Sequence, residues 1–158
     1  MAEAKAPRSL ARNKRARHDY HILEQIEAGI ELWGTEVRSL RVGGAQITEA
    51  YVRIERGEAW LHGAHIQPYE FGNRQNHDPT RSRRLLLHRR QIDHLQGAVK
   101  QPGMTLIPLD MHLHRNRVKV ELGLGRGKRE YDKRYALAER EARRQMERGM
   151  RRDFKNAV

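Results

Sequence analysis

The sequence has no cysteine, few aromatic residues and no long apolar run. Without cysteine, neither a disulfide framework nor thiolate chemistry is available to these 158 residues. No apolar stretch approaches the roughly 20 residues of a membrane-spanning helix, and the basic N-terminus lacks the apolar stretch of a secretory signal. These absences together predict a cytoplasmic protein that does not associate with membranes.

Motifs for metal binding and catalysis are missing as well. The closest histidine pairs, His62 with His65 and His112 with His114, have no third or fourth ligand at metal-binding spacing. The glycines around Gly125 lack the spacing of a phosphate-binding loop and the Ser or Thr that follows it. We therefore predict no metal, no cofactor and no enzymatic activity. A nuclease whose carboxylates meet only in the folded chain is the remaining enzymatic alternative.

Positive charge is in excess, and it is concentrated at the two ends of the chain. The formal net charge is +12, of which residues 1–17 carry +5, residues 126–158 carry +6 and residues 18–125 carry only +1. A nearly neutral body with two strongly basic ends is typical of a globular domain whose arms bind nucleic acid. Two solvated tails that only keep the protein soluble are the alternative.

Alternating apolar residues predict antiparallel strands in the body. Period-two patterns cover residues 20–33, 107–113 and 118–124, and two shorter strands are expected over residues 47–54 and 59–66. Arg115-Asn116 separates the last two long patterns and is expected to turn the chain into a hairpin.

Two short helices are expected among these strands. Thr35 can serve as the N-cap of the first, which stops at Gly43-Gly44. The second begins at Leu85, after a polar loop over residues 67–84, and ends before Pro102.

These elements predict a mainly β fold, most economically a small closed OB-like β-barrel with short flanking α-helices. The expected organisation is a disordered basic N-terminus over residues 1–12, the barrel over residues 13–125 and a basic C-terminal tail over residues 126–158. The tail has many helix formers but only a thin stripe of mostly small apolar residues. We therefore expect it to be disordered alone and helical when bound to a polyanion.

Several segments resemble one known family when they are taken together and in order. They are Asn13-Lys-Arg-Ala-Arg-His-Asp-Tyr20, Glu27-Ala-Gly-Ile-Glu-Leu32, Gly34-Thr-Glu-Val-Arg-Ser-Leu-Arg41, Gly57-Glu-Ala-Trp-Leu61, Asp78-Pro-Thr-Arg-Ser-Arg-Arg-Leu-Leu-Leu-His88, Gly125-Arg-Gly-Lys128 and Tyr131-Asp-Lys-Arg134. The family that they resemble is SmpB, the SsrA-binding (tmRNA-binding) proteins of bacterial trans-translation. The resemblance runs from about Asn13 to Met150.

The resemblance implies an RNA-binding protein that is not an enzyme. It implies binding to the tRNA-like domain of tmRNA and delivery of tmRNA, with EF-Tu, to stalled ribosomes, where incomplete proteins are tagged. It also implies that the tail enters the decoding centre and the empty mRNA channel of the small subunit, where it contacts rRNA. The alternative is a generic ribosome-associated RNA-binding or RNA-chaperone protein. Under both hypotheses we expect the protein to be a monomer.

The same resemblance implies two sets of site residues. The tmRNA-binding surface would include Asn13, Lys14, Arg15, Arg17, His18, Tyr20, Glu27, Glu36, Arg38, Arg41, Leu86, His88 and Lys119. The ribosome-contacting tail would use Gly127, Lys128, Tyr131, Asp132, Lys133, Arg134, Met150 and Arg151.

The chain departs from the family pattern near its end. Relatives often carry an Ile-Met-Lys triplet where this sequence reads Gly149-Met150-Arg151. A glycine inside a helix costs about 1 kcal/mol relative to alanine, so this departure leaves the role of the last segment open.

Overall fold

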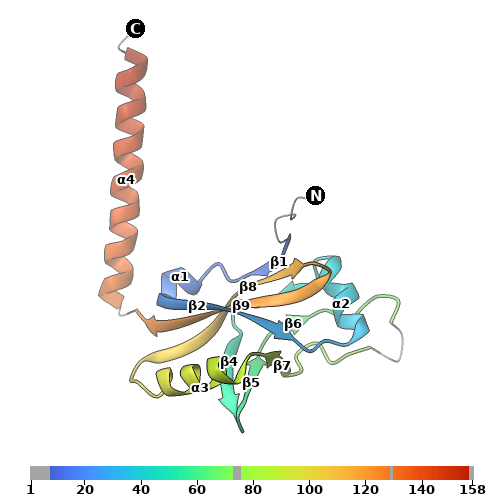
Figure 1. Ribbon diagram of the computed structural model, residues 1–158. Coiled ribbons are helices and arrows are strands. Elements are labelled where there is room, and N and C mark those ends of the chain that lie inside the picture. Colours follow the sequence, from blue (N-terminus) through green and yellow to red (C-terminus); the bar gives the residue numbers. More distant parts are fainter. Residues whose placement is uncertain (1–7, 73–75, 129, 157–158) are drawn as a thin grey trace, which may run out of the picture. The chain divides into compact units, whose positions relative to one another are not determined.

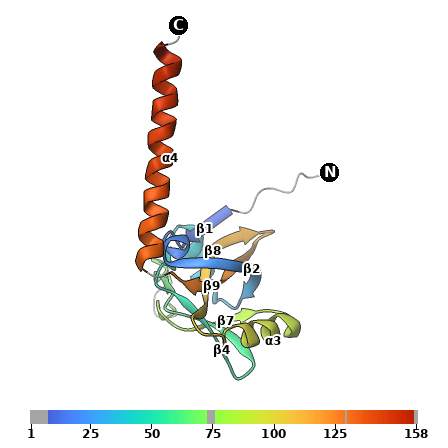
Figure 2. The same ribbon diagram turned by 90° about the vertical axis from the view of Figure 1, so that its left-hand side faces the viewer.

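The computed structural model describes residues 8–72, 76–128 and 130–156. The chain divides into two compact units, residues 1–127 and 128–158, which we call the body and the tail. Figure 1 labels the elements, and Figure 2 shows the same ribbon turned by 90°.

The body is mainly β, as the alternating pattern predicts. Its strands are β1 (Arg8–Arg12), β2 (Tyr20–Ile30), β3 (Ala45–Gln46), β4 (Tyr51–Glu55), β5 (Glu58–His62), β6 (His65–Ile66), β7 (Arg83–Leu86), β8 (Met104–His114) and β9 (Arg117–Gly127). Its helices are α1 (Ala16–Asp19), α2 (Gly34–Arg41) and α3 (Arg89–Ala98).

Seven of these strands form one sheet in the order β1-β8-β4-β5-β7-β2-β9, in which β8 also pairs with β9. The hydrogen-bonded pairs can therefore be followed from β8 through β4, β5, β7, β2 and β9 back to β8. Every pairing is antiparallel. Strands β3 and β6 form a separate two-stranded sheet.

The predicted hairpin is confirmed at β8 and β9. The register pairs His114 with Arg117, so Arg115 and Asn116 form a two-residue turn. Their φ angles are 50° and 63°, and positive φ at both central residues matches the twist of the flanking strands. The hairpin is longer than the pattern predicts because the strands run from Met104 to Gly127.

Residues 8–12 correct one prediction. We expected them to be disordered, but they form β1, which pairs with β8. Leu10 and Ala11 are partly buried against the core. The segment is too short and too basic for its two apolar residues to reveal a strand, because its partner lies about a hundred residues later in the sequence.

The second helix begins later than predicted. Leu85 starts no helix, because Arg83–Leu86 is strand β7 between β5 and β2. The helix α3 follows at Arg89, and it buries Ile92 and Leu95. The leucines at 85 and 95 fit a helical period, so periodicity alone could not separate a short buried strand from the helix after it.

The core of the body lies between the strands and the helices α2 and α3. Its fully buried side chains include Leu40, Leu61, Leu85, Met111 and Leu122. They come from α2, β5, β7, β8 and β9, so the core fixes how the surface residues of all these elements are placed.

The tail contains one helix, α4 (Glu130–Asn156). Each of its described side chains, at residues 137–150, is exposed. The tail is helical in this structure, which is the state that we expected for the bound tail. The expectation that the tail is disordered alone stays a prediction.

Candidate nucleic-acid interface

Asn13 anchors the turn between β1 and α1. Its backbone N–H donates to the carbonyl of Leu109 at 2.9 Å, and its Nδ2 donates to the carbonyl of Pro108 at 3.0 Å. Its Oδ1 accepts from the backbone N–H of Arg15 at 3.3 Å. Asn13 is buried, so the structure corrects the expected surface contact. Asn13 holds the turn on β8 and thereby positions the neighbouring cations.

The cations of this turn line two cavities. Lys14, Arg15 and Arg17 are exposed. A cavity of about 540 Å³ on one side is lined by Lys14 and Arg17 together with residues of β1, β2, β8 and β9. A second cavity of about 420 Å³, which we call the α1–β4 pocket, is lined by Arg15 and by residues of β4. The basic turn can therefore present charge in two directions.

The next two predicted residues lie at the end of α1. His18 is half-buried, and its Nδ1 lies 3.0 Å from the carboxylate of Asp19. Tyr20 begins β2 and lines the α1–β4 pocket. The structure thus places Tyr20 beside the basic turn, as the sequence order suggests.

Glu27 and Lys119 share one face of the sheet. Glu27 pairs with Glu121 and Gly29 pairs with Lys119 across β2 and β9. Directly opposite residues and residues two apart on a strand point to the same side. The side chain of Glu27 is 52 % exposed, so this side is the outer one.

Leu86 joins the same face from β7. Gly29 pairs with Leu86 as well as with Lys119, and a Cβ at Gly29 would lie 3.1 Å from the Leu86 Cβ. The absence of a Cβ at Gly29 therefore leaves space for the Leu86 side chain. Leu86, 46 % exposed, lines a groove of about 240 Å³ together with Lys119 and Arg117. We call Glu27, Leu86, Arg117 and Lys119 the β2–β9 face.

Two residues of this region were missed by sequence reasoning. Arg117 is exposed and lies two residues before Lys119 on β9, so the period of the strand could have indicated it. The Nε2 of His112 lies 3.4 Å from the Glu27 carboxylate. That contact joins residues 85 apart in sequence, so no local pattern could have indicated it.

His88 lies just outside this groove. It precedes α3, is exposed, and its backbone N–H donates to the Gln91 side chain at 3.0 Å. It follows Leu86, the last residue of β7, by two positions.

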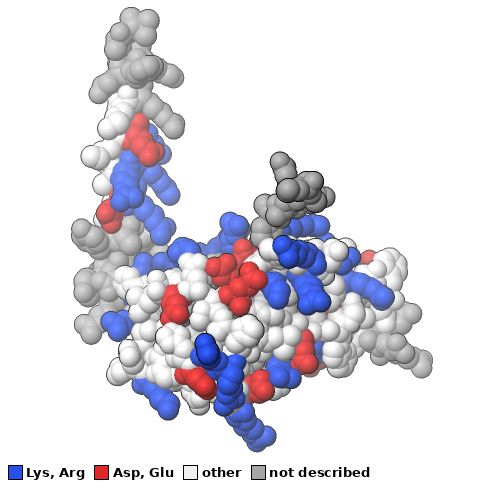
Figure 3. Space-filling view, in the orientation of Figure 1, with Lys and Arg blue, Asp and Glu red and all other residues white. Residues whose placement is uncertain are grey.

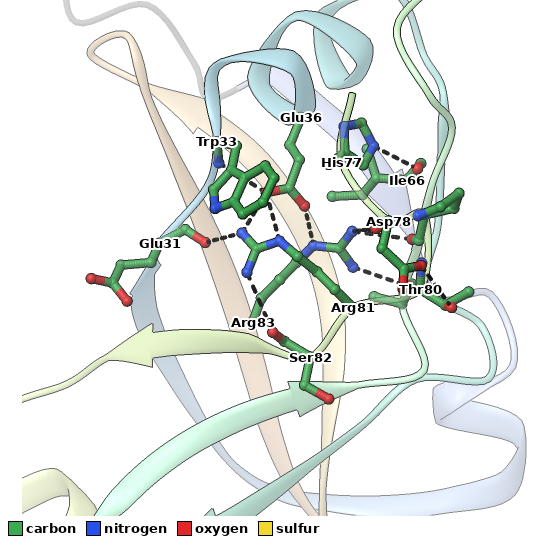
Figure 4. A network of polar contacts seen from close by, with 12 residues as sticks. Glu31, Trp33, Glu36, Ile66, His77, Asp78, Thr80, Arg81, Ser82 and Arg83 are labelled. Carbon is green, nitrogen blue, oxygen red and sulfur yellow. Dashed lines mark hydrogen bonds and ion pairs between the residues drawn. The ribbon is translucent and has the colours of Figure 1, made fainter. Parts of the chain in front are cut away.

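Glu36 is not on the surface, which corrects a second expected contact. Its side chain is 0 % exposed and forms ion pairs with Arg81 and Arg83 (Figure 4). The backbone N–H of Trp33 donates to the same carboxylate at 2.8 Å. This contact places Glu36 in the first turn of α2, which begins after Trp33 rather than after the predicted N-cap Thr35.

The two arginines connect this carboxylate to the surrounding loop. Arg83, also buried, donates to the carbonyls of Ala64 at 2.9 Å and Pro79 at 3.1 Å. The Arg81 guanidinium carbon lies 5.1 Å from the centre of the Trp33 ring. The network therefore joins α2, β7 and the segment before β7 (Figure 4).

The charge on Glu36 is stabilised in this setting. Burial by itself would raise the pKa of the Glu36 carboxyl, but hydrogen bonds from Arg81, the Trp33 N–H and Arg83 outweigh it, and the pKa is lowered from 4.5. Burial also lowers the pKa of Arg83, against the opposing effect of Glu36. Glu36 is thus a structural anion that fixes the start of α2.

The other two predicted residues of α2 are exposed. The guanidinium carbon of Arg38 lies 6.0 Å from the centre of the Tyr69 ring. The backbone carbonyl of Arg41 accepts from Arg8 at 3.5 Å. Neither arginine lines the groove beside Leu86, although Val37 of the same helix does.

Both signs of charge are interspersed on the body. In Figure 3, Lys and Arg lie close to Asp and Glu over the part of the body seen there. A surface of mixed charge does not bind RNA through general attraction to phosphate alone. It favours recognition by shape and specific contacts, with cations at chosen places.

The predicted tail residues fall in or beside α4. Gly127 ends β9, and Lys128, half-buried, is the first residue of the tail. The helix backbone includes Tyr131, Asp132, Lys133, Arg134 and Arg151, whose side chains lie outside the described part of the chain. Met150 is exposed, and Gly149 lies inside the helix.

The described residues lack two features of other protein classes. Within residues 8–72, 76–128 and 130–156, no group of three His, Asp or Glu side chains could hold a metal ion. No helix in the same ranges is both long enough and apolar enough to cross a membrane.

Comparison with known proteins gives one consistent family. The family model described as SmpB protein matches residues 10–152. An SsrA-binding protein of Lysinibacillus sphaericus (strain C3-41) is 52 % identical over 139 residues, which cover 88 % of this chain and 90 % of the relative. An SsrA-binding protein of Thermobifida fusca (strain YX) is 51 % identical over 150 residues, which cover 95 % of this chain and 94 % of the relative.

A solved structure agrees with these relatives. It is described as "tmRNA-SmpB: a journey to the center of the bacterial ribosome". The matching chain is 49 % identical, with a TM-score of 0.65 over 80 % of this chain and 92 % of that one.

Proposed function

The chain belongs to the SmpB family, and on this premise we propose that it binds the tRNA-like domain of tmRNA and acts in trans-translation on stalled ribosomes. Both relatives are named SsrA-binding proteins, and the matching structure contains a tmRNA–SmpB complex. An RNA-binding role without catalysis agrees with this family.

The observation that carries the proposal is the β2–β9 face. Three residues that the sequence placed on the RNA surface, Glu27, Leu86 and Lys119, come together there around Gly29. Lys119 supplies a cation for a phosphate, Leu86 an apolar contact for a sugar or base, and Glu27 an acceptor for a 2′-hydroxyl. A set of one cation, one apolar group and one acceptor suits a folded RNA better than a bare polyanion.

We propose that the ring of strand pairings is a closed OB-like barrel. Its proposed bounds are residues 13–125, with β1 added on its β8 side, and the tail covers residues 126–158. Gly127 and Lys128 would act as the hinge between them, which agrees with the boundary between the two compact units.

The tail would probe the decoding centre and the empty mRNA channel of the small subunit. Of its residues, Tyr131, Asp132, Lys133 and Arg134 form the proposed contact with rRNA, and Met150 and Arg151 extend it. The net charge of +6 over residues 126–158 favours a polyanionic partner. We also propose that the protein is a monomer in the cytoplasm and that EF-Tu takes part in delivery.

A competition assay tests the function. The full chain is bound to labelled tRNA-like domain of tmRNA at near-physiological salt, and either the unlabelled domain or ordinary tRNA is added. We expect the unlabelled domain to compete at far lower concentration than tRNA. Equal competition would favour the alternative, a generic RNA-binding or RNA-chaperone protein.

Variants of the β2–β9 face locate the binding. We expect Lys119→Ala and Leu86→Ala each to weaken binding of the domain by about tenfold. Lys100→Ala removes an exposed lysine after α3 and serves as the matched control. Leu86→Met keeps the apolar volume and should bind nearly as the parent does. If Lys100→Ala had the same effect as Lys119→Ala, general charge would explain the binding.

A further inference from the structure

The α1–β4 pocket shares Asn13 and Ala16 with the 540 Å³ cavity and includes no residue of the β2–β9 face. Its volume of about 420 Å³ lies within the range of about 300–1,000 Å³ that small-molecule sites occupy. Its lining includes two residues of each of three kinds: the cations Arg15 and Arg53, the aromatic residues Tyr20 and Tyr51, and the acids Asp19 and Glu49.

Tyr51 forms a fixed aromatic wall. Its ring centre lies 5.4 Å from that of His62, its partner across β4 and β5, with 31° between the ring planes. The guanidinium carbon of Arg53 lies 5.1 Å from the centre of the Tyr51 ring. Tyr51 is nonetheless 40 % exposed. An exposed ring held by its neighbours binds an apolar or aromatic ligand at little entropic cost.

Three charged groups of the pocket, those of Arg15, Glu49 and Arg53, can accept a further partner. Among the described residues, the Arg15 guanidinium and the Glu49 carboxylate make no hydrogen bond or ion pair. Arg53 contacts only the Tyr51 ring through its guanidinium within the same part of the chain. Guanidinium groups without a carboxylate partner are suited to bind phosphate.

The acids restrict what the ligand can be. A carboxylate repels phosphate, so Glu49, which lines the same pocket as Arg15 and Arg53, suits the N–H donors of a base rather than the backbone of a nucleic acid. Guanine presents two neighbouring N–H groups on its Watson–Crick edge, which one carboxylate can accept together. The other bases present fewer such donors side by side.

From these features we propose that the α1–β4 pocket binds one unpaired nucleotide of an RNA, with a preference for guanine. Arg15 and Arg53 receive the phosphate, Tyr51 contacts the base, and Glu49 accepts from its edge. This site goes beyond the proposed function, because it gives the body a second RNA contact away from the β2–β9 face.

Titration of the full, ¹⁵N-labelled chain tests the proposal. GMP, AMP, CMP, UMP and inorganic phosphate are added separately, and backbone amide shifts are followed by NMR. We expect GMP to shift the amides of residues 48–53 in a saturable manner and to bind about fivefold or more tighter than the other nucleotides. The proposal is overturned if phosphate alone binds as well as GMP, or if no nucleotide shifts residues 48–53.

Matched variants separate the parts of the site. Glu49→Gln should abolish the preference for GMP, whereas Glu70→Gln, an exposed acid outside the pocket, should not. Tyr51→Leu should weaken all four nucleotides, whereas Tyr69→Leu, which removes another tyrosine beside an arginine, should not. Arg53→Gln provides a second variant if Tyr51→Leu lowers the melting temperature. Retention of the GMP preference in Glu49→Gln would refute the role of the carboxylate.

The result is independent of the proposed function. The same variants are assayed for binding to the tRNA-like domain of tmRNA, where we expect less than about a twofold change. Failure of the parent chain to bind that domain would contradict the proposed function alone. Failure to bind GMP would contradict this inference alone.

Discussion

The body and the tail obtain their structures in different ways. In the body, even charged groups are buried and paired, as Glu36 is with Arg83, and side chains from many elements fill one core. In α4, residues 137–150 are all exposed, and an exposed pair such as Glu139 and Arg143, 3.6 Å apart, contributes only about 0.3–0.5 kcal/mol. The body therefore carries its own stability, and we predict that the tail depends on what it binds.

The difference between the body and the tail is tested most directly by changing the tail without changing the body. We expect the triple variant Asp132→Ala, Lys133→Ala, Arg134→Ala to abolish tagging on stalled ribosomes and to leave binding of the tRNA-like domain nearly unchanged. Tagging in a reconstituted translation system and domain binding are measured side by side. The double variant Glu139→Ala, Arg143→Ala, which removes an exposed pair of α4, is the control. A loss of domain affinity as large as that of an Asn13–Arg17 variant would refute the separation of the two surfaces.

A change inside the body should have the largest effect on stability. Glu36→Ala leaves Arg81 and Arg83 without their carboxylate, and breaking a buried pair costs about 3–5 kcal/mol. Urea unfolding followed by tryptophan fluorescence measures it, because both tryptophans, Trp33 and Trp60, lie in the body. Glu58→Ala breaks the partly exposed pair with Arg84, 3.1 Å apart, and should cost less than about 1 kcal/mol. Equal costs for the two variants would contradict the central role of Glu36.

Acid should weaken the body through the same residue. Because the folded pKa of Glu36 is lowered from 4.5, its contribution is fully present above the unfolded pKa and is lost as the pH falls through the folded value. The parent chain should therefore lose more free energy of unfolding between neutral pH and pH about 3 than Glu36→Gln does. If the free energy of unfolding changed equally with pH in the two proteins, protonation of Glu36 would not be coupled to folding.

The smallest effect is expected from removing the tail. A chain ending at Gly127 should differ from the full chain by less than about 1 kcal/mol in free energy of unfolding, as read from Trp33 and Trp60. The same truncation should lower the salt dependence of ribosome binding, because it removes cations that displace counterions. A large drop in melting temperature would mean that the tail stabilises the body.

The sequence predicted what local pattern determines. The alternation on both sides of Arg115-Asn116 indicated the β8–β9 hairpin, and the turn chemistry agreed. It did not predict the burial of Asn13 or Glu36, because a polar residue is buried only where distant partners satisfy it. The partners of Glu36 lie 45 and 47 residues away, and the Pro108 carbonyl that holds Asn13 lies 95 residues away.

The candidate interface shows the same contrast between features set by local pattern and features set by distant contacts. Glu27, Leu86 and Lys119 were named from the resemblance, but only the strand register brings them to one face around Gly29. The α1–β4 pocket had no sequence pattern of its own, since its walls come from α1, β4 and β8. Register and the order of strands in a sheet are global properties that spacing along one strand does not contain.

The pairing of β1 with β8 can form only late in the synthesis of the protein, after β8 has been made. Ser9 Oγ donates to the Asp110 carboxylate at 2.8 Å across a separation of 101 residues. At about 5–20 residues per second, the first strand waits roughly 5–20 s for its partner to be made. During that interval its backbone groups have no ladder to join. A ribosome that stalls before β8 is complete leaves this first strand unpaired.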